Sequence, residues 1–174
     1  TNSISVLLNS SDGLFSHVGS VALGRRPHDV IAGDFNSDGC VDLVTANLWD
    51  ATISVLLGDC NAGFSPPMHV NAGTNPVAVD CADFDGDGHL DIAVTNQSVD
   101  SVSVLLNSGN ASFDFVWVGS APGSPHQIAT ADVNLDRAVD IVYSANSVDS
   151  IRLITNGVNA ATVVGITVSG TYPN

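Results

Sequence analysis

Glutamate and lysine are entirely absent from this 174-residue chain. All 18 acidic residues are aspartates and all four basic residues are arginines, which gives a formal net charge of −14. Without lysine, a Walker-type phosphate loop and Schiff-base chemistry are excluded. Because so acidic a surface repels phosphate backbones and anionic lipids, we expect no nucleic-acid partner and no membrane insertion. Clustered aspartates instead attract cations.

Long hydrophobic runs are also missing. The longest apolar stretch, residues 160–168, is far shorter than a membrane-spanning helix. Hydrophobic residues nevertheless make up 44% of the chain, which argues against disorder. The strong helix formers Glu and Lys are absent, whereas Val, Ile, Thr, Ser, Gly and Asn are plentiful, so the composition predicts strands and turns.

Three markers recur along the chain with a constant step of 49 residues. An aspartate-rich segment starts at Asp34, Asp83 and Asp132. Two further series keep the same step: the Ser-Val-Leu-Leu strands that start at Ile4, Ile53 and Val102, continued at Ile151, and the prolines Pro27, Pro76 and Pro125. Three markers in one register establish an internal repeat, which decides the fold class.

Each repeat contains four short segments of strand character separated by turn residues, which predicts an all-β chain of four-stranded antiparallel β-propeller blades. In the first complete repeat we expect strands near residues 29–33, 41–46, 52–57 and 64–70. A β-solenoid or a sandwich of similar strand count is the alternative. The predicted single repeat domain, 1–174, then divides into a half blade, 1–23, and three blades, 24–72, 73–121 and 122–174, about three and a half blades in all.

The aspartate-rich segments have the spacing Asp-x-[Asp/Asn]-x-Asp-Gly-x-x-Asp, which suits a cation bound in a tight loop. Oxygens at positions 1, 3 and 5 converge as the loop curls, Gly at position 6 allows a positive φ, position 7 offers its backbone carbonyl, and position 9 closes the shell. The predicted metal ligands are Asp34, Asn36, Asp38, Cys40 and Asp42 in loop 1, Asp83, Asp85, Asp87, His89 and Asp91 in loop 2, and Asp132, Asn134, Asp136, Ala138 and Asp140 in loop 3.

The composition of these loops predicts calcium. An all-oxygen, carboxylate-rich shell suits Ca²⁺ and disfavours zinc or copper, while Mg²⁺ prefers fewer protein ligands. An EF-hand would need twelve residues, a terminal Glu and flanking helices, none of which is present. We therefore expect two to three Ca²⁺ ions.

The loops and their neighbours resemble the FG-GAP/VCBS repeats of integrin alpha-chain propellers and of many extracellular proteins. The resemblance rests on the Gly-Asp-Phe-Asn-Ser-Asp-Gly segment from Gly33, on Asp-Phe-Asp-Gly-Asp-Gly from Asp83, on Asp-Ile-Ala-Val from Asp91, and on the Ser-Val-Leu-Leu strand followed by Phe64. It implies a propeller, an extracellular or cell-surface location and Ca²⁺ in the loops. Loop 3 departs from the pattern because Arg137 replaces the glycine.

Three cysteines leave one unpaired in a secreted chain. If the second and third strands of the first blade pair about the turn at 47–51, Val41 lies opposite Gly58 and Cys40 comes close to Cys60. We therefore predict a Cys40–Cys60 disulfide and a small buried thiol at Cys81, the alternative being three free cysteines.

Other candidate sites carry weaker signals. Asn9, Asn96 and Asn110 lie in Asn-x-Ser/Thr motifs and are candidate glycosylation sites, although chance alone predicts a similar number. His28 and His126 share one repeat position, but on different blades we expect them to lie far apart and to be structural.

The sequence offers no catalytic set that leaves the loop aspartates free for metal, so we expect no enzyme. It predicts a non-enzymatic structural or adhesion scaffold, with a carbohydrate-binding lectin as the alternative. Sugar sites usually repeat a stacking ring; Trp49 and Trp117 occupy different repeat positions, and Phe15, Phe64 and Phe113, which do repeat, suit a core position. This favours the scaffold.

An open array of blades leaves exposed edges, which proteins normally cover. We expect further blades or copies of the chain itself as partners, joined head to tail in a larger assembly or filament, with a protein or glycan ligand as a further partner. The alternative is that a longer polypeptide supplies the missing blades.

Overall fold

The computed structural model describes residues 2–156 and 163–166. In this part of the chain, all regular structure is β-strand except for two single 3₁₀ turns, η1 (Gln97–Val99) and η2 (Asn146–Val148). No described helix is long and apolar enough to cross a membrane.

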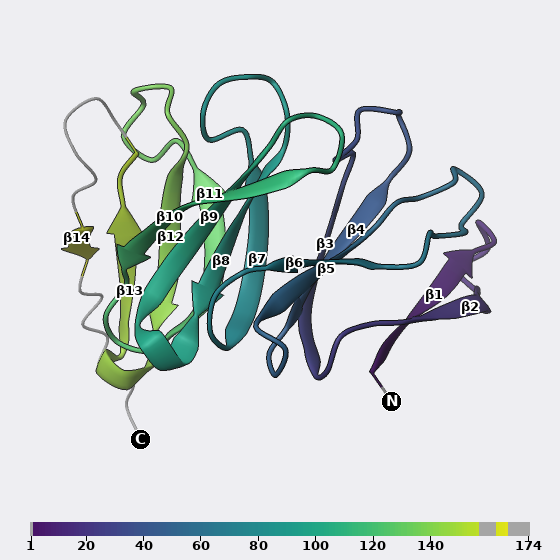
Figure 1. Ribbon diagram of the computed structural model, residues 1–174, viewed down its shortest axis with the longest axis horizontal. Helices are drawn as coiled ribbons and strands as arrows, with labels where there is room; N and C mark the ends of the chain where they lie inside the picture. The colour runs from purple at the N-terminus through teal and green to yellow at the C-terminus, as the bar shows by residue number, and fades with distance from the viewer. Residues whose placement is uncertain (1, 157–162, 167–174) are drawn as a thin grey trace.

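The described residues contain fourteen strands, which form one two-stranded and three four-stranded antiparallel sheets (Figure 1). The two-stranded sheet is β1 (Ser3–Asn9) and β2 (Phe15–Ala22). Blade 1 is β3 (Pro27–Gly33), β4 (Asp42–Asn47), β5 (Thr52–Leu56) and β6 (Met68–Asn71); blade 2 is β7 (Pro76–Ala82), β8 (Asp91–Asn96), β9 (Ser101–Asn107) and β10 (Phe113–Ser120); blade 3 is β11 (Pro125–Ala131), β12 (Asp140–Ala145), β13 (Ser150–Ile154) and β14 (Val163–Ile166). Each four-stranded sheet pairs its strands in chain order, as a meander does.

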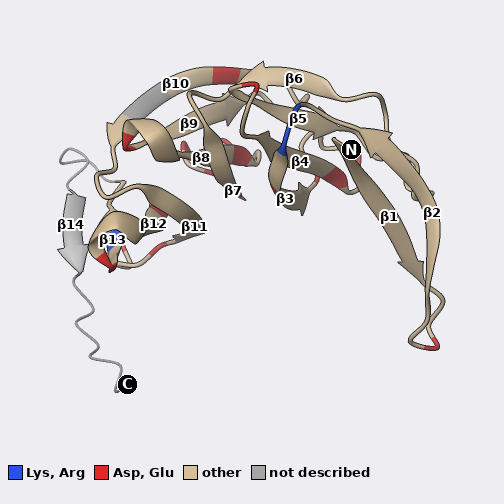
Figure 2. Cartoon of the chain, turned by 90° about the horizontal axis from the view of Figure 1, so that it is seen from below, with Lys and Arg blue, Asp and Glu red and all other residues tan. Residues whose placement is uncertain are grey.

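The sheets follow one another along an arc, with the two-stranded sheet projecting at one end (Figure 2). This arrangement of successive four-stranded meanders confirms the prediction of β-propeller blades. The described strands of the four sheets lie within the segments 1–23, 24–72, 73–121 and 122–174.

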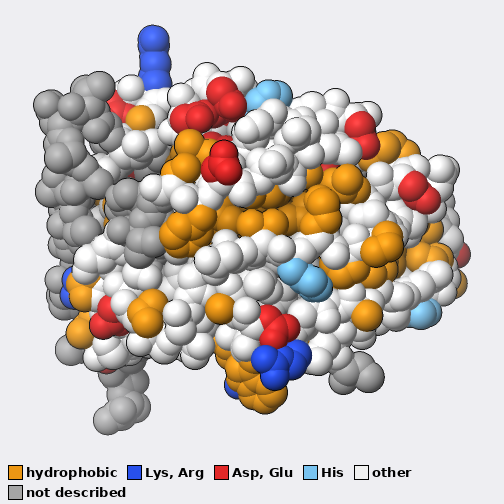
Figure 3. Space-filling view, in the orientation of Figure 1, with side chains coloured by type: hydrophobic (Ala, Val, Ile, Leu, Met, Phe, Trp, Pro, Cys, Tyr) orange, Lys and Arg blue, Asp and Glu red, His pale blue; other side chains and the backbone are white. Residues whose placement is uncertain are grey.

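The hydrophobic core lies between neighbouring blades. One cluster joins blades 1 and 2 through side chains such as Phe35, Ile53 and Leu105, and a second joins blades 2 and 3 through side chains such as Val104 and Tyr143. Blade 2 is covered on both faces, and all six residues of its strand β8 are buried. Figure 3 shows hydrophobic side chains in a band across one face of the molecule.

Strand β6 is shorter than the sequence predicted. We expected a strand over residues 64–70, but the regular strand is Met68–Asn71. Pro66 and Pro67 lack the N–H groups that a ladder needs, so Phe64 keeps only an isolated bridge to Gly58. In β2 and β10, where no proline intervenes, the strand begins at the equivalent phenylalanine.

The β1–β2 sheet exposes side chains that are buried in the blades. Leu7 is 53% exposed, whereas its equivalents Leu56 and Leu105 are fully buried. Phe15 is 64% exposed, so the expectation that the repeated phenylalanines all occupy the core is wrong for this one. The difference arises because Leu105 and Phe113 pack against the preceding blade, whereas no preceding blade lies against the β1–β2 sheet among the described residues.

Candidate metal centre

Each of the three aspartate-rich loops joins the first strand of a blade to its second. The first aspartate organises each loop. In loop 1, the two carboxylate oxygens of Asp34 accept hydrogen bonds from the N–H groups of Asp38 (3.1 Å) and Gly39 (2.9 Å). Asp83 and Asp132 accept the equivalent pairs of bonds in loops 2 and 3. The repeat therefore folds into the same curled backbone three times.

Two backbone positions in each loop have positive φ. Position 6 was predicted, and Gly39, Gly88 and Arg137 have φ of 84°, 89° and 76°. Position 4 was not predicted, and it has φ of 60°, 82° and 63° at Ser37, Gly86 and Leu135. Because neither residue at these positions in loop 3 is a glycine, that loop carries more backbone strain than the other two.

The last aspartate of each loop is buried and ties the loop to the rest of its blade. Asp91 is fully buried; its oxygens accept hydrogen bonds from the N–H of Phe84 and the N–H of Asn107, each 2.8 Å long. Asp42 and Asp140 are equally buried and make the corresponding bonds. The carboxylate has roughly four lone-pair directions, so two such bonds leave room for a cation.

In loop 2, three carboxylates converge. Asp83, Asp85 and Asp91 each offer an oxygen, and the three oxygens lie within 4.8 Å of one another. Two oxygens bound to one Ca²⁺ lie at most about 5 Å apart, since each Ca–O bond is about 2.5 Å long. The donor set and its spacing therefore fit Ca²⁺. Bound there, the ion would neutralise the clustered carboxylates and crosslink both ends of the loop.

The environment of Asp91 disfavours its negative charge. Burial raises the pKa of its carboxyl group, backbone hydrogen bonds from Asn107 and Phe84 lower it, and the neighbouring charges of Asp85 and Asp87 raise it again. The carboxyl group is thus held in a partly dry site beside two like charges.

Loops 1 and 3 differ from loop 2 at position 3. There the amide of Asn36 donates a 2.8 Å hydrogen bond to the side chain of Asp38, and Asn134 donates a 3.0 Å bond to Asp136. In loop 2, position 3 is Asp85, which has no such donor. Loop 2 therefore carries one more negative charge and the greater need for a cation.

A family model for FG-GAP-like repeats matches the sequence twice, over residues 34–94 and 83–143. The two matches together span more than half of the chain. The chain belongs to the FG-GAP-like repeat family. Each match starts at the first aspartate of a metal loop and ends in the second strand of the next blade, so a pair of consecutive FG-GAP-like loops lies inside each match.

One similar solved structure is described as a Photorhabdus luminescens Tc holotoxin pore with the mutation TccC3-D651A. It is 17% identical with a TM-score of 0.52, and the alignment covers 87% of this chain but 8% of that one. At this identity the likeness shows the fold alone. No curated protein matches the sequence.

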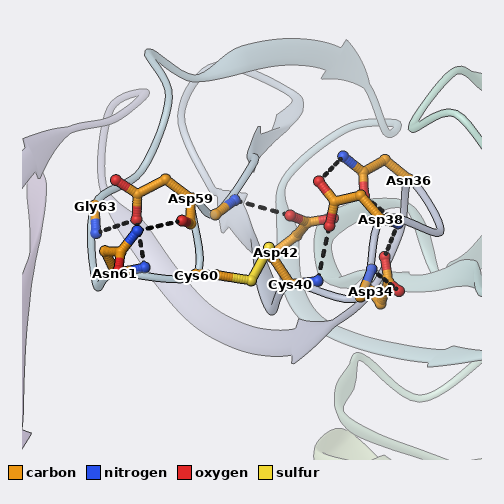
Figure 4. The surroundings of a disulfide bond; sticks show 11 residues. Asp34, Asn36, Asp38, Cys40, Asp42, Asp59, Cys60, Asn61 and Gly63 are labelled. Atoms are coloured by element: carbon orange, nitrogen blue, oxygen red, sulfur yellow. Dashed lines mark hydrogen bonds between the residues drawn. A yellow bond between two sulfur atoms is a disulfide. The ribbon is translucent and has the colours of Figure 1, made fainter.

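The predicted disulfide is present in the FG-GAP-like blade 1. Cys40 and Cys60 are bonded with their Cα atoms 5.0 Å apart, which links loop 1 to the turn between β5 and β6 (Figure 4). Cys81 is free and half-buried. Burial, and then the negative charge of Asp80, raise the pKa of its thiol.

Blade 2 makes the same link without a covalent bond. The residues equivalent to the two cysteines are His89 and Gly109, and a Cβ built on Gly109 would collide with the His89 ring. His89 also reaches the neighbouring blade, since its Nδ1 lies 3.2 Å from the Ser37 hydroxyl. The side chain at position 7 therefore packs against the blade, which suits the prediction that this residue offers only its backbone carbonyl to a metal.

The candidate glycosylation sites differ in access. Asn9 is exposed at the end of β1, and Asn110 is exposed in the turn between β9 and β10. Asn96 is fully buried, and its amide donates a 2.6 Å hydrogen bond to the Ser103 hydroxyl. Asn96 is therefore not available for glycosylation in the folded chain, contrary to the expectation from its sequence motif.

The two repeated histidines lie close together, contrary to expectation. The rings of His28 on β3 and His126 on β11 meet edge to face, with centroids 5.5 Å apart. His28 Nδ1 lies 2.8 Å from the carbonyl oxygen of Val77, so Nδ1 carries a proton and donates it. First strands of alternate blades approach each other on the inner side of the arc, and sequence spacing could not show this.

Proposed function

We propose that this chain is a calcium-stabilised, non-enzymatic scaffold that works extracellularly as part of a larger assembly. The observation that carries the proposal is the convergence of Asp83, Asp85 and Asp91 in a loop that recurs in every complete blade. Each loop joins two strands and, through its last aspartate, the start of the next turn of the same blade. A cation held there has a structural role in the blade rather than a catalytic one.

In each loop, four side chains and one backbone carbonyl would hold the ion. In loop 2 these are Asp83, Asp85, Asp87, Asp91 and the carbonyl of His89. Loop 1 offers Asp34, Asn36, Asp38, Asp42 and the carbonyl of Cys40, and loop 3 offers Asp132, Asn134, Asp136, Asp140 and the carbonyl of Ala138. An extracellular location is supported by the Cys40–Cys60 bond, because disulfides persist in oxidising compartments. A role within an assembly is supported by the similar solved structure, which is that of a holotoxin pore.

Thermal unfolding with and without a calcium chelator tests the proposal. An ion that binds only the folded state at a thousand times its Kd stabilises that state by about 4 kcal/mol. We therefore expect a clear drop in Tm on chelation, full recovery with excess Ca²⁺ and weaker recovery with Mg²⁺. An unchanged Tm in excess chelator would show that the loops are turns without a structural ion.

A further inference from the structure

One turn and one loop residue meet at the joint between blades 1 and 2, beside the hydrophobic cluster that the two blades share. The side-chain amide of Asn107 donates a 2.7 Å hydrogen bond to the backbone carbonyl of Phe35, and the N–H of Ala111 donates a 3.0 Å bond to the same oxygen. Phe113 packs edge to face on the Phe35 ring, 6.0 Å away. The turn after the third strand of one blade thus binds the residue at position 2 of the preceding blade's loop. We call this set of contacts, two hydrogen bonds and one ring contact, the grip.

The joint between blades 2 and 3 repeats the asparagine bond of this arrangement. Asn156, which is equivalent to Asn107, donates a 3.0 Å hydrogen bond to the carbonyl of Phe84, the residue equivalent to Phe35. The asparagine bond therefore occurs at both joints between described blades.

Blade 3 presents the same contact point, and no other described blade covers it. Position 2 of its loop is Val133, which is 46% exposed, whereas Phe35 is fully buried. Ile151 of β13 is also 46% exposed, and its blade 1 equivalent Ile53 is fully buried. Within the described residues, no hydrogen bond reaches the Val133 carbonyl.

The turn between β1 and β2 carries the matching grip. Asn9 is equivalent to Asn107 and Phe15 to Phe113, and both are exposed. Blade 1 has Gly58 at the asparagine position, so it has no side-chain amide to donate. In the described chain no metal loop precedes that blade.

This turn already has the conformation that grips. Ser11 and Gly13 have φ of 66° and 84°, against 79° and 57° at the equivalent residues of blade 2. Asn9 Oδ1 accepts a 3.0 Å hydrogen bond from the N–H of Ser11, as Asn107 Oδ1 accepts one of 3.1 Å from Gly109. The bond orients the Asn9 amide so that its Nδ2 is free to donate.

We infer that the β1–β2 turn of one copy of this chain docks on the exposed face of blade 3 of a second copy. Asn9 donates to the Val133 carbonyl, and the Phe15 ring covers Val133 and Ile151. The inference rests on the proposed scaffold function and names its partner. Because the two surfaces differ, the contact is head to tail, and it propagates into a ring or a filament.

Sedimentation velocity of the full chain in Ca²⁺ at physiological salt tests the inference. We expect wild-type protein to associate with rising concentration. Phe15→Ala, Val133→Asp and Asn9→Asp, which removes the amide donor, should each weaken association about tenfold or more. Phe115→Ala is the matched control, since Phe115 is 42% exposed on β10 but lies outside the grip.

A mixing experiment fixes the polarity of the contact. Phe15→Ala keeps an intact blade 3 face, and Val133→Asp keeps an intact turn. At a concentration at which the wild type associates, each variant alone should be mainly monomeric, while a mixture should form one-to-one dimers that do not grow further. A wild-type chain that remains monomeric at all concentrations, or a mixture without dimers, would overturn the inference. Chelator-dependent melting of the same samples reports separately on the calcium scaffold, so the two proposals can fail independently.

Discussion

At the scale of single residues, loop 3 shows how one substitution changes a repeated site. Arg137 occupies the position that is glycine in loops 1 and 2, and the backbone keeps its positive φ of 76°. An L-residue in this conformation costs about 1 kcal/mol relative to glycine. The strain remains because Asp132 still accepts the Arg137 N–H at 2.9 Å and holds the curl of the loop.

Replacing this arginine should therefore stabilise the chain. We expect Arg137→Gly to raise the free energy of unfolding by about 1 kcal/mol, which corresponds to roughly 2–4 °C in Tm for a chain of this size. The reciprocal control is Gly88→Ala in loop 2; no atom lies within 4 Å of the added Cβ, so the change isolates the φ of 89° and should destabilise by a similar amount. Equal melting temperatures for all three proteins would contradict the strain argument.

The charge at position 3, together with Arg137 in loop 3, should set the order of calcium affinity among the loops. We expect loop 2 to bind most tightly, then loop 1, then loop 3. Asp85→Asn gives loop 2 the amide found in loop 1, and it should weaken its Ca²⁺ binding roughly tenfold. Asn36→Asp is the converse variant and should tighten loop 1. Titration calorimetry of both variants measures these affinities. If the affinity of the tightest site is unchanged in Asp85→Asn, loop 2 is not the tightest site and the ranking is wrong.

At the scale of elements, the disulfide fastens two connections of one blade. Loop 1 and the β5–β6 turn are 20 residues apart in sequence and are joined by Cys40–Cys60. This blade also has the short β6, whose ladder Pro66 and Pro67 interrupt. The crosslink therefore lies where the hydrogen bonding of the sheet is weakest.

Removing this crosslink should cost about 3 kcal/mol, because a closed loop of about 20 residues limits the unfolded chain. We expect Cys40→Ser/Cys60→Ser to melt well below the wild type while still responding to Ca²⁺. Cys81→Ala is the control and should change the stability less. Mapping of unreduced peptides should find Cys81 unlinked, and its raised thiol pKa should make its alkylation slow at neutral pH. A linkage between Cys81 and either partner would refute the strand register.

The strands could be predicted from sequence because three copies of one pattern constrain each other. The 49-residue step placed the β4–β5 hairpin and brought Cys40 opposite Cys60. Three features depended on neighbours that the pattern does not encode. The prolines shortened β6, and Phe15 is exposed because no described blade lies against it as blade 1 lies against Phe113. The curvature of the array brought His28 against His126. The burial of Asn96 could likewise not be predicted from the sequence, because a glycosylation motif does not show which face of a strand carries it.

At the scale of the whole molecule, the blades differ in how many neighbours cover them. Blade 2 packs against a blade on each side, and strand β8 is buried along its whole length. The β1–β2 sheet pairs only with itself among the described strands and exposes most of its apolar residues. In a repeat array, stability is approximately a sum of the stability of each unit and of its contacts with neighbours.

Local stability should therefore fall from the centre of the array to its edges. We expect native-state hydrogen exchange at low protein concentration to be slowest in β8 and β9, faster in β4 and β5, and fastest in β1 and β2. Chelation of Ca²⁺ should speed exchange mainly in the strands that flank the three loops. At higher concentration, docking of the β1–β2 turn on a second copy should slow exchange there and leave β8 unchanged. Protection of β1 and β2 equal to that of β8 at every concentration would contradict both the edge argument and the proposed contact.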